Sequence, residues 1–147
     1  MSVKLIALLA AATAGVFMAL QGALNARLSK AVGLLEATFF VHAIGIIFIL
    51  VLFFFGLGKG SFAKYAEAPW YVYIGGVLGV AIIYGVVRAI PQVGVAPATT
   101  AIIIAQVSTA AFIDHFGLFG LQQMEFTWLK GLGLILLAAG GYVLLRN

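Results

Sequence analysis

The chain has 147 residues, of which 65% are hydrophobic and 8% are charged, and its mean hydropathy is +1.21. Soluble domains typically carry about 25% charged residues, so this composition excludes a water-soluble domain and predicts an integral membrane protein. The formal charge of +4 is dispersed along the chain, which argues against a nucleic-acid surface, and the lack of cysteine excludes disulfides and thiolate metal sites.

The first predicted element is a spanning helix over residues 5–24, since a span needs about 20 mostly apolar residues. The chain starts like a cleavable signal peptide, with a positive charge before a short apolar run that ends at Ala12-Thr13-Ala14. We expect no cleavage, because the apolar run continues past that triplet. Gln21 and Asn25 lie one turn apart on one face, where neutral amides suit a neutral or zwitterionic substrate or bond to a neighbouring helix.

The second predicted span covers residues 34–55, after a connection at residues 25–33. Glu36 stands in its first turn, where the helix N-terminus stabilises a carboxylate. His42 lies two turns from Glu36, and a histidine at this depth either lines a pathway or is hydrogen-bonded in the packing. Glycines, lysines and a glutamate in the next stretch, "GLGKGSFAKYAEAP" at residues 56–69, predict an aqueous loop.

The third predicted span, residues 70–88, ends with Tyr84 and Arg88 one turn apart. Arg88 either extends its charge to the membrane surface or attracts an anionic group of a substrate into a cavity. Two prolines follow in "AIPQVGVAPATT". Because Pro91 disfavours helix before it and Pro97 suits a first helical position, residues 89–96 are predicted to form a tight hairpin, either an ordinary interfacial turn or one beside a pathway.

The fourth and fifth predicted spans cover residues 97–114 and 128–145, joined by residues 115–127. Thr99 and Gln106 share one face of the fourth span, and the amide of Gln106 near mid-depth is costly to leave without a partner. No nucleophile accompanies Asp114 and His115, so this pair is expected to cap the helix or meet water. We predict neither an enzyme nor a metal or cofactor site.

Lysine and arginine are balanced between the two sides of the predicted five-helix protein. Each side carries four: Lys4, Lys59, Lys64 and Lys130 on the side of the amino terminus, and Arg27, Lys30, Arg88 and Arg146 on the other. Because an excess of these residues normally fixes orientation, we predict insertion in both orientations and an antiparallel homodimer that supplies the inverted repeat many transporters carry in one chain. The alternative is one orientation set by cellular factors.

The sequence also resembles the YdcZ-type family of the drug/metabolite transporter superfamily. The resemblance runs through "QGALNARLSK", "IGGVLGV", the P-x-x-G at Pro91 to Gly94, the "AQ" of the fourth span and "IDHFGLFG". It implies a five-helix unit equivalent to half of a ten-helix transporter. The family motif positions in this chain would be Gln21, Asn25, Gly75, Gly76, Pro91, Gly94, Gln106, Asp114, His115, Phe116 and Gly117. The chain lacks the mid-membrane carboxylate that small multidrug exporters use for cations.

Together these features predict a single transmembrane domain over residues 1–147, in the inner membrane, that transports a small organic molecule by alternating access. The expected partners are a second copy, the lipid bilayer and an unidentified small substrate, with no nucleic acid. An ion channel and a non-transporting scaffold are the alternative functions. The residues expected to bind substrate are Gln21, Asn25, His42, Tyr84, Arg88, Thr99 and Gln106.

Overall fold

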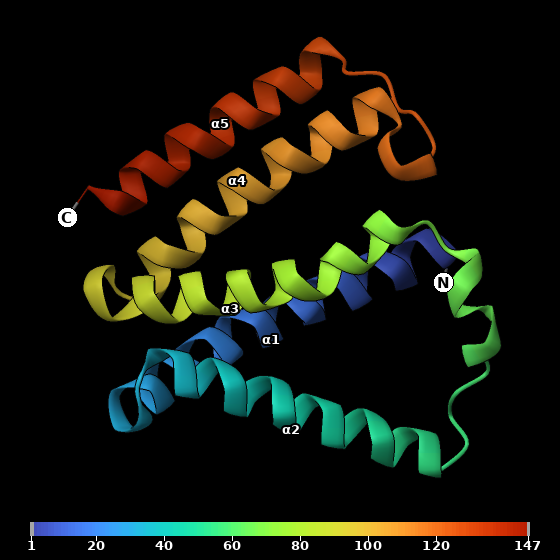
Figure 1. Cartoon of the computed structure of the whole chain (residues 1–147). Coiled ribbons are helices and arrows are strands. Elements are labelled where there is room, and N and C mark those ends of the chain that lie inside the picture. Colours follow the sequence, from blue (N-terminus) through green and yellow to red (C-terminus); the bar gives the residue numbers. More distant parts are fainter. Residues whose placement is uncertain (1, 147) are drawn as a thin grey trace. The chain divides into compact units, whose positions relative to one another are not determined.

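The computed structural model describes residues 2–146. Its long helices are α1 (Val3–Val32), α2 (Leu34–Phe54), α3 (Ile74–Val93), α4 (Val95–Phe116) and α5 (Trp128–Leu145) (Figure 1). The short 3₁₀ helices η1 (Phe62–Glu67), η2 (Trp70–Tyr73) and η3 (Leu118–Gly120) lie in the connections. Each long helix, with η2 joined to α3, is long and apolar enough to cross a membrane, so the prediction of five helical spans is confirmed.

The chain divides into two compact units, Met1–Gln92 and Val93–Asn147. The first unit contains α1, α2 and nearly all of α3, and the second contains α4 and α5. Within the first unit α1 packs against α2, and within the second α4 packs against α5.

The predicted connection at residues 25–33 is wrong, because α1 continues to Val32 and Gly33 alone separates it from α2. Gly33 has φ 102° and ψ 161°, a backbone conformation that is essentially limited to glycine. Its N–H donates to the carbonyl of Ser29 at 3.0 Å, and its own carbonyl accepts from the N–H of Ala37 at 3.0 Å. Helical hydrogen bonding therefore continues on both sides of the turn, as backbone near a membrane requires.

The predicted hairpin at residues 89–96 is also wrong, because α3 runs through Pro91 to Val93 and Gly94 alone precedes α4. Gly94 has φ 92° and ψ 166°, nearly the same conformation as Gly33. Pro91 lies in the last turn of α3, so the loss of its N–H and the clash of its ring with the carbonyl of Val87 affect only the end of the helix. Pro97 is the third residue of α4 and not the first, still within the turn whose N–H groups need no helical partner.

The core of the first unit lies near the Gly33 end. The residues buried there are Gly22, Asn25 and Ala26 of α1, Ala37 and Thr38 of α2, and Val87 and Ile90 of α3. In Figure 1, α2 and α3 lie close at this end and diverge toward the loop that joins them. A Cβ added at Gly22 would lie 3.0 Å from Cδ1 of Ile90, so the absence of a side chain on α1 makes room for the side chain of Ile90 of α3.

The small residues Ala11 and Gly15, which recur every fourth position in the first half of α1, do not take part in this core. Both are exposed, and a Cβ at Gly15 would meet nothing within 4 Å. The spacing of small residues in the sequence therefore identifies a possible packing face without showing which part of it is used.

Gly22→Leu should lower the free energy of unfolding, because the added side chain must displace Ile90 and Val86. Overpacking of this kind costs about 1–3 kcal/mol. Thermal unfolding of the purified protein in detergent measures the loss, with Gly15→Leu as the matched control on the same helix. An equal effect of the two substitutions would contradict the assignment of the core to the Gly33 end.

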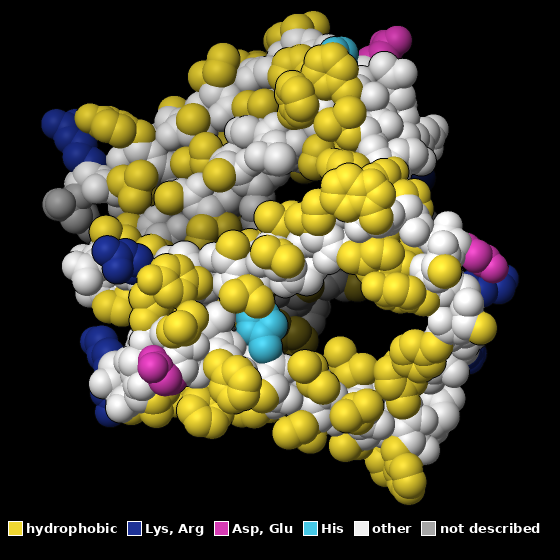
Figure 2. Space-filling model, in the orientation of Figure 1, with side chains coloured by type: hydrophobic (Ala, Val, Ile, Leu, Met, Phe, Trp, Pro, Cys, Tyr) yellow, Lys and Arg dark blue, Asp and Glu magenta, His cyan; other side chains and the backbone are white. Residues whose placement is uncertain are grey.

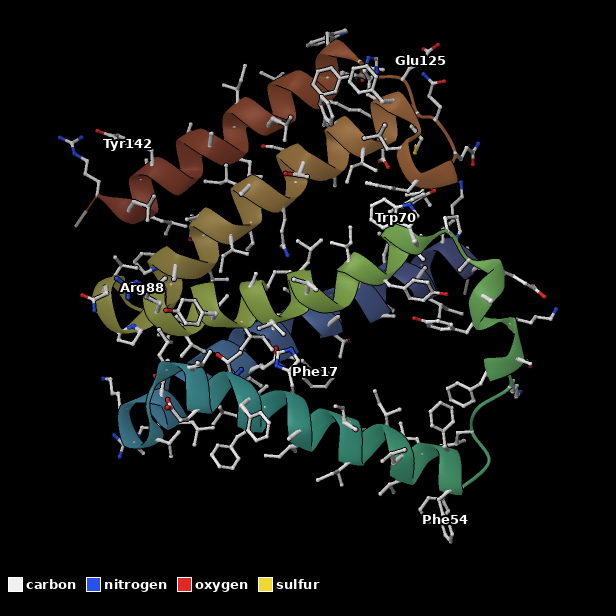
Figure 3. All side chains as sticks on the ribbon, viewed as in Figure 1. Phe17, Phe54, Trp70, Arg88, Glu125 and Tyr142 are labelled. Atoms are coloured by element: carbon white, nitrogen blue, oxygen red, sulfur yellow. The ribbon has the colours of Figure 1, made fainter. Side chains whose placement is uncertain are left out.

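The predicted aqueous loop at residues 56–69 is confirmed as a non-spanning connection containing η1. The hydroxyl of Tyr73 donates to the carbonyl of Tyr65, and the two rings lie 4.3 Å apart between centroids. Trp70 is exposed at the start of η2 (Figure 3), at the end of a candidate span where amphipathic rings are favoured.

In the second unit, α4 and α5 meet at Gly141, which is buried. A Cβ at Gly141 would collide with Cδ1 of Ile104 and lie 3.1 Å from Cγ2 of Thr100. The absence of a side chain on α5 therefore makes room for Ile104 of α4. This contact also fixes which face of α4 is directed toward α5.

Candidate functional site

The two amides predicted at the end of the first span lie in different environments. Asn25 is buried, with 8% of its surface exposed, on the face of α1 that carries Gly22 and Ala26. Gln21 is exposed, at the margin of that face. Within residues 2–146 no hydrogen bond joins either amide to another group, so neither holds the helices of its own unit together.

A groove of about 600 Å³ lies along α2 and beside α3, within the first unit. It is lined by Leu35, Glu36, Thr38, Phe39, Phe40 and His42 of α2 and by Val80 of α3. Figure 2 shows a histidine, in cyan, on this face among yellow hydrophobic side chains. Of the predicted site residues, the structure places His42 here.

The hydrogen bond of His42 determines which of its two ring nitrogens is available to a ligand in the groove. Nδ1 lies 2.8 Å from the carbonyl oxygen of Thr38, one turn earlier on the same helix. Because a carbonyl can only accept, Nδ1 carries the proton in this contact and Nε2 of the neutral ring is left as an acceptor. Nε2 faces α3, since a Cβ added at Gly79 would lie 3.9 Å from it.

Tyr84 and Arg88 lie near the end of α3 that leads to Gly94, and Figure 3 labels Arg88 there. Tyr84 is 38% exposed and Arg88 is exposed, whereas Val87 between them in sequence is 1% exposed. The pair therefore lies off the face of α3 that packs in the core. Neither residue lines the groove beside α2.

In the second unit, Thr99 and Gln106 share the face of α4 directed away from α5. With 3.6 residues per turn, Gln106 lies about 200° around the helix from Ile104, which packs on α5. Gln106 is exposed and Thr99 is half-buried. The α4–α5 pair therefore does not use the amide of Gln106, which remains free for other groups.

A smaller groove of about 280 Å³ runs between α4 and α5. Its one polar side chain belongs to Thr100, whose hydroxyl donates to the carbonyl of Ala96 at 2.9 Å. The other lining residues are Ile103, Leu136, Leu137, Gly140, Gly141 and Leu144. This groove offers no free donor or charge with which to orient a ligand.

The loop after α4 owes its shape to the backbone of the "IDHFGLFG" segment. The N–H of Gly117, in the left-handed conformation at φ 58°, donates to the carbonyl of Asp114 at 3.3 Å. Met124 donates its N–H to the same carbonyl at 2.8 Å, and the amide of Gln123 donates to the carbonyl of His115 at 2.9 Å. The "IDHFGLFG" motif of the resemblance thus builds a folded loop.

The ring of His115 lies edge-on to Phe116 and Phe126, at centroid distances of 4.8 and 6.3 Å. Its Nδ1 is enclosed and has no hydrogen-bond partner among residues 2–146. We expected Asp114 and His115 to cap the helix or to meet water. The C-cap of α4 is the αL residue Gly117, whose N–H donates to the backbone carbonyl of Asp114. No group of three or more histidine, aspartate and glutamate side chains in that same range is arranged to hold a metal ion.

The predicted site residues thus fall in separate places. His42 lines the groove beside α2. Asn25 lies in the core near the Gly33 end, and Tyr84 and Arg88 lie off the packed face of α3. Glu36 was not among the predicted binding residues, yet it lines the groove with His42. The local sequence gives no signal for this, because the groove depends on where α3 passes beside α2.

Residues 6–143 of the chain match the model of a protein family described as "Putative inner membrane exporter, YdcZ". The matched range includes all five long helices almost to their ends, together with the seven predicted site residues. No curated protein and no solved structure matches the chain.

Proposed function

Because the chain belongs to the YdcZ family of inner-membrane exporters and is therefore a multi-pass membrane transporter, we propose that it exports a small organic molecule by alternating access as an antiparallel homodimer. The observation that carries this proposal is the presence of amides on the candidate spanning helices α1 and α4 without partners in their own unit. Gln106 lies on a free face of α4, and Asn25 makes no hydrogen bond within residues 2–146. Polar groups left open in this way at membrane depth are typical of a substrate pathway.

The antiparallel arrangement is supported by charge and by helix number. The four lysines and arginines on each side give no preference for one orientation. An odd number of spans places the two ends of the chain on opposite sides of the membrane, so one chain cannot contain its own inverted repeat. Two copies in opposite orientations would form the pseudo-symmetric pair around which transporters alternate access.

Purified protein in proteoliposomes tests the transport function. A carrier gives flux that saturates with substrate and shows counterflow, in which unlabelled substrate on one side drives labelled substrate from the other. Single-channel currents with a charged permeant would select an ion channel instead. If the protein folds and forms dimers but shows no flux with any compound of a metabolite panel, the result supports a non-transporting scaffold.

Gln106→Ala should lower the saturable flux at subsaturating substrate by about three- to tenfold, as expected from the loss of one hydrogen bond to substrate. Folding should be unaffected, because the exposed amide has no partner in its unit. Ser108→Ala is the matched control, since that hydroxyl donates to the carbonyl of Ile104 on its own helix at 2.8 Å. If Gln106→Ala and Ser108→Ala give equal flux, and Gln21→Ala and Asn25→Ala also leave the flux unchanged, these amides are not part of the pathway.

A further inference from the structure

Every free polar atom in the groove beside α2 is a hydrogen-bond acceptor. The hydroxyl hydrogen of Thr38 is used, since it donates to the carbonyl of Leu34 at 2.9 Å. The Nδ1 hydrogen of His42 is used on the carbonyl of Thr38. What remains is the carboxylate of Glu36, Nε2 of His42 and the lone pairs of the Thr38 hydroxyl. A ligand that satisfies this groove must bring the donors itself.

The carboxylate of Glu36 lies where the end of a helix favours an anion. It lies in the first turn of α2, where the helix dipole favours an anion, and it lies over Gly33, where an added Cβ would collide with Oε2. No ion pair joins it to a lysine or arginine within residues 2–146. An unpaired carboxylate beside an apolar groove attracts a cation, and a cation that also donates hydrogen bonds makes the stronger contact.

The remaining walls of the groove are hydrophobic. Phe39 and Phe40 pack edge to face, with ring centroids 5.8 Å apart, and Leu35 and Val80 complete the lining. Aromatic faces add cation–π attraction for a positively charged group near them. Glu36 and His42 are six residues apart on one helix, about 9 Å along its axis, so the two acceptors flank an apolar stretch that suits an aryl or alkyl body.

We propose that this groove binds an organic amine, a primary or secondary ammonium on an apolar body, and that such amines are the substrate class of the transport proposed above, on which this inference rests. The ammonium donates to Glu36, and the apolar body lies along Phe39 and Phe40 toward His42. A neutral compound lacks the charge, and a quaternary ammonium lacks the N–H donors.

Direct binding tests the inference without requiring transport. Tritiated 4-phenylbutylamine is titrated onto the full-length protein in nanodiscs of phosphatidylcholine and phosphatidylglycerol, whose headgroups carry no N–H donor. The alcohol 4-phenylbutanol and the corresponding trimethylammonium compound compete with it. We expect the amine to bind saturably and both competitors to bind at least about tenfold more weakly, since a charge-assisted hydrogen bond contributes about 1.5–3 kcal/mol.

Glu36→Gln should weaken amine binding by about tenfold or more for the same reason, while the weak binding of the alcohol stays unchanged. Glutamine also serves at this position of a helix N-terminus, so folding is retained. Glu67→Gln is the matched control, because it removes a carboxylate from the exposed η1 helix away from the groove. Unchanged amine affinity in Glu36→Gln, or equal affinity for the amine and either competitor, would overturn the inference.

The outcome also separates this inference from the proposed transport. If the protein does not bind the amine but shows saturable counterflow of a neutral compound, the amine site is wrong. The proposed export function is then still supported. Amine binding that depends on Glu36, in protein without counterflow of any compound, supports the site and contradicts the transport.

Discussion

Lysines introduced together as Gly60→Lys and Ser61→Lys should abolish saturable flux when this variant is expressed alone. Both positions are exposed in the loop after α2, and a Cβ at Gly60 would meet nothing within 4 Å. The added charges break the balance between the two sides, so the positive-inside bias directs all copies into one orientation. Copies in a single orientation cannot form the antiparallel dimer, and counterflow in proteoliposomes measures the loss.

The complementary variant carries Ala31→Lys and Gln92→Lys on the other side, at exposed positions in the last turns of α1 and α3, where cations are favourable. It should also be inactive alone, and co-expression of the two variants should restore flux. A chain with all four lysines is balanced again and should be active by itself. Because the chain has no cysteine, single introduced cysteines report orientation without background. One orientation for the unmodified protein, or full activity of each variant alone, would contradict the antiparallel dimer.

Gly33→Ala should lower the free energy of unfolding more than the same substitution at Gly94 or Gly76. Its backbone conformation is nearly restricted to glycine, which costs a larger residue about 1–3 kcal/mol. The added Cβ also collides with the carboxylate of Glu36. Gly94→Ala separates the two effects, because it has the same backbone conformation but only an ordinary contact, with Cδ of Pro97 at 3.6 Å.

Gly76→Ala provides the baseline for these two substitutions. It lies inside α3 with nothing within 4 Å of an added Cβ, so alanine should stabilise the helix by up to about 1 kcal/mol. Thermal unfolding of the three variants in one detergent should rank them with Gly76→Ala the most stable and Gly33→Ala the least. The account of the single-glycine turns is wrong if Gly94→Ala unfolds like Gly76→Ala.

The spans were predictable because length and hydrophobicity decide them. The fifth helix has the predicted bounds, and the second differs from its prediction by one residue. The connections at residues 25–33 and 89–96 were predicted wrongly. In the first, Arg27 and Lys30 lie on α1, where long side chains can reach water while the backbone stays helical. The second connection was predicted from Pro91 and Pro97, whereas the backbone conformations of Gly33 and Gly94 separate the helices.

The candidate site was predicted less well, for a geometric reason. Spacing shows which residues share a face but not which face is covered by a neighbour. Gln21 and Asn25 are one turn apart, yet only Asn25 is buried, because the packing of α1 is centred on Gly22 and Ala26. The role of Glu36 in the groove depends on where α3 passes, and nothing in the local sequence around Glu36 contains that information.

The confinement of tight packing to one end of the first unit has a mechanical consequence. The buried residues hold α1, α2 and α3 together at the Gly33 end, whereas the far half of α2 is joined to α3 by the loop at residues 56–69. Lateral pressure of lipid on that far half would therefore act on the packed end, beside Asn25 and Glu36. In two oppositely inserted copies the packed ends would lie in opposite leaflets. A change of lipid in one leaflet would then act on the packed end of one copy and on the far half of α2 in the other.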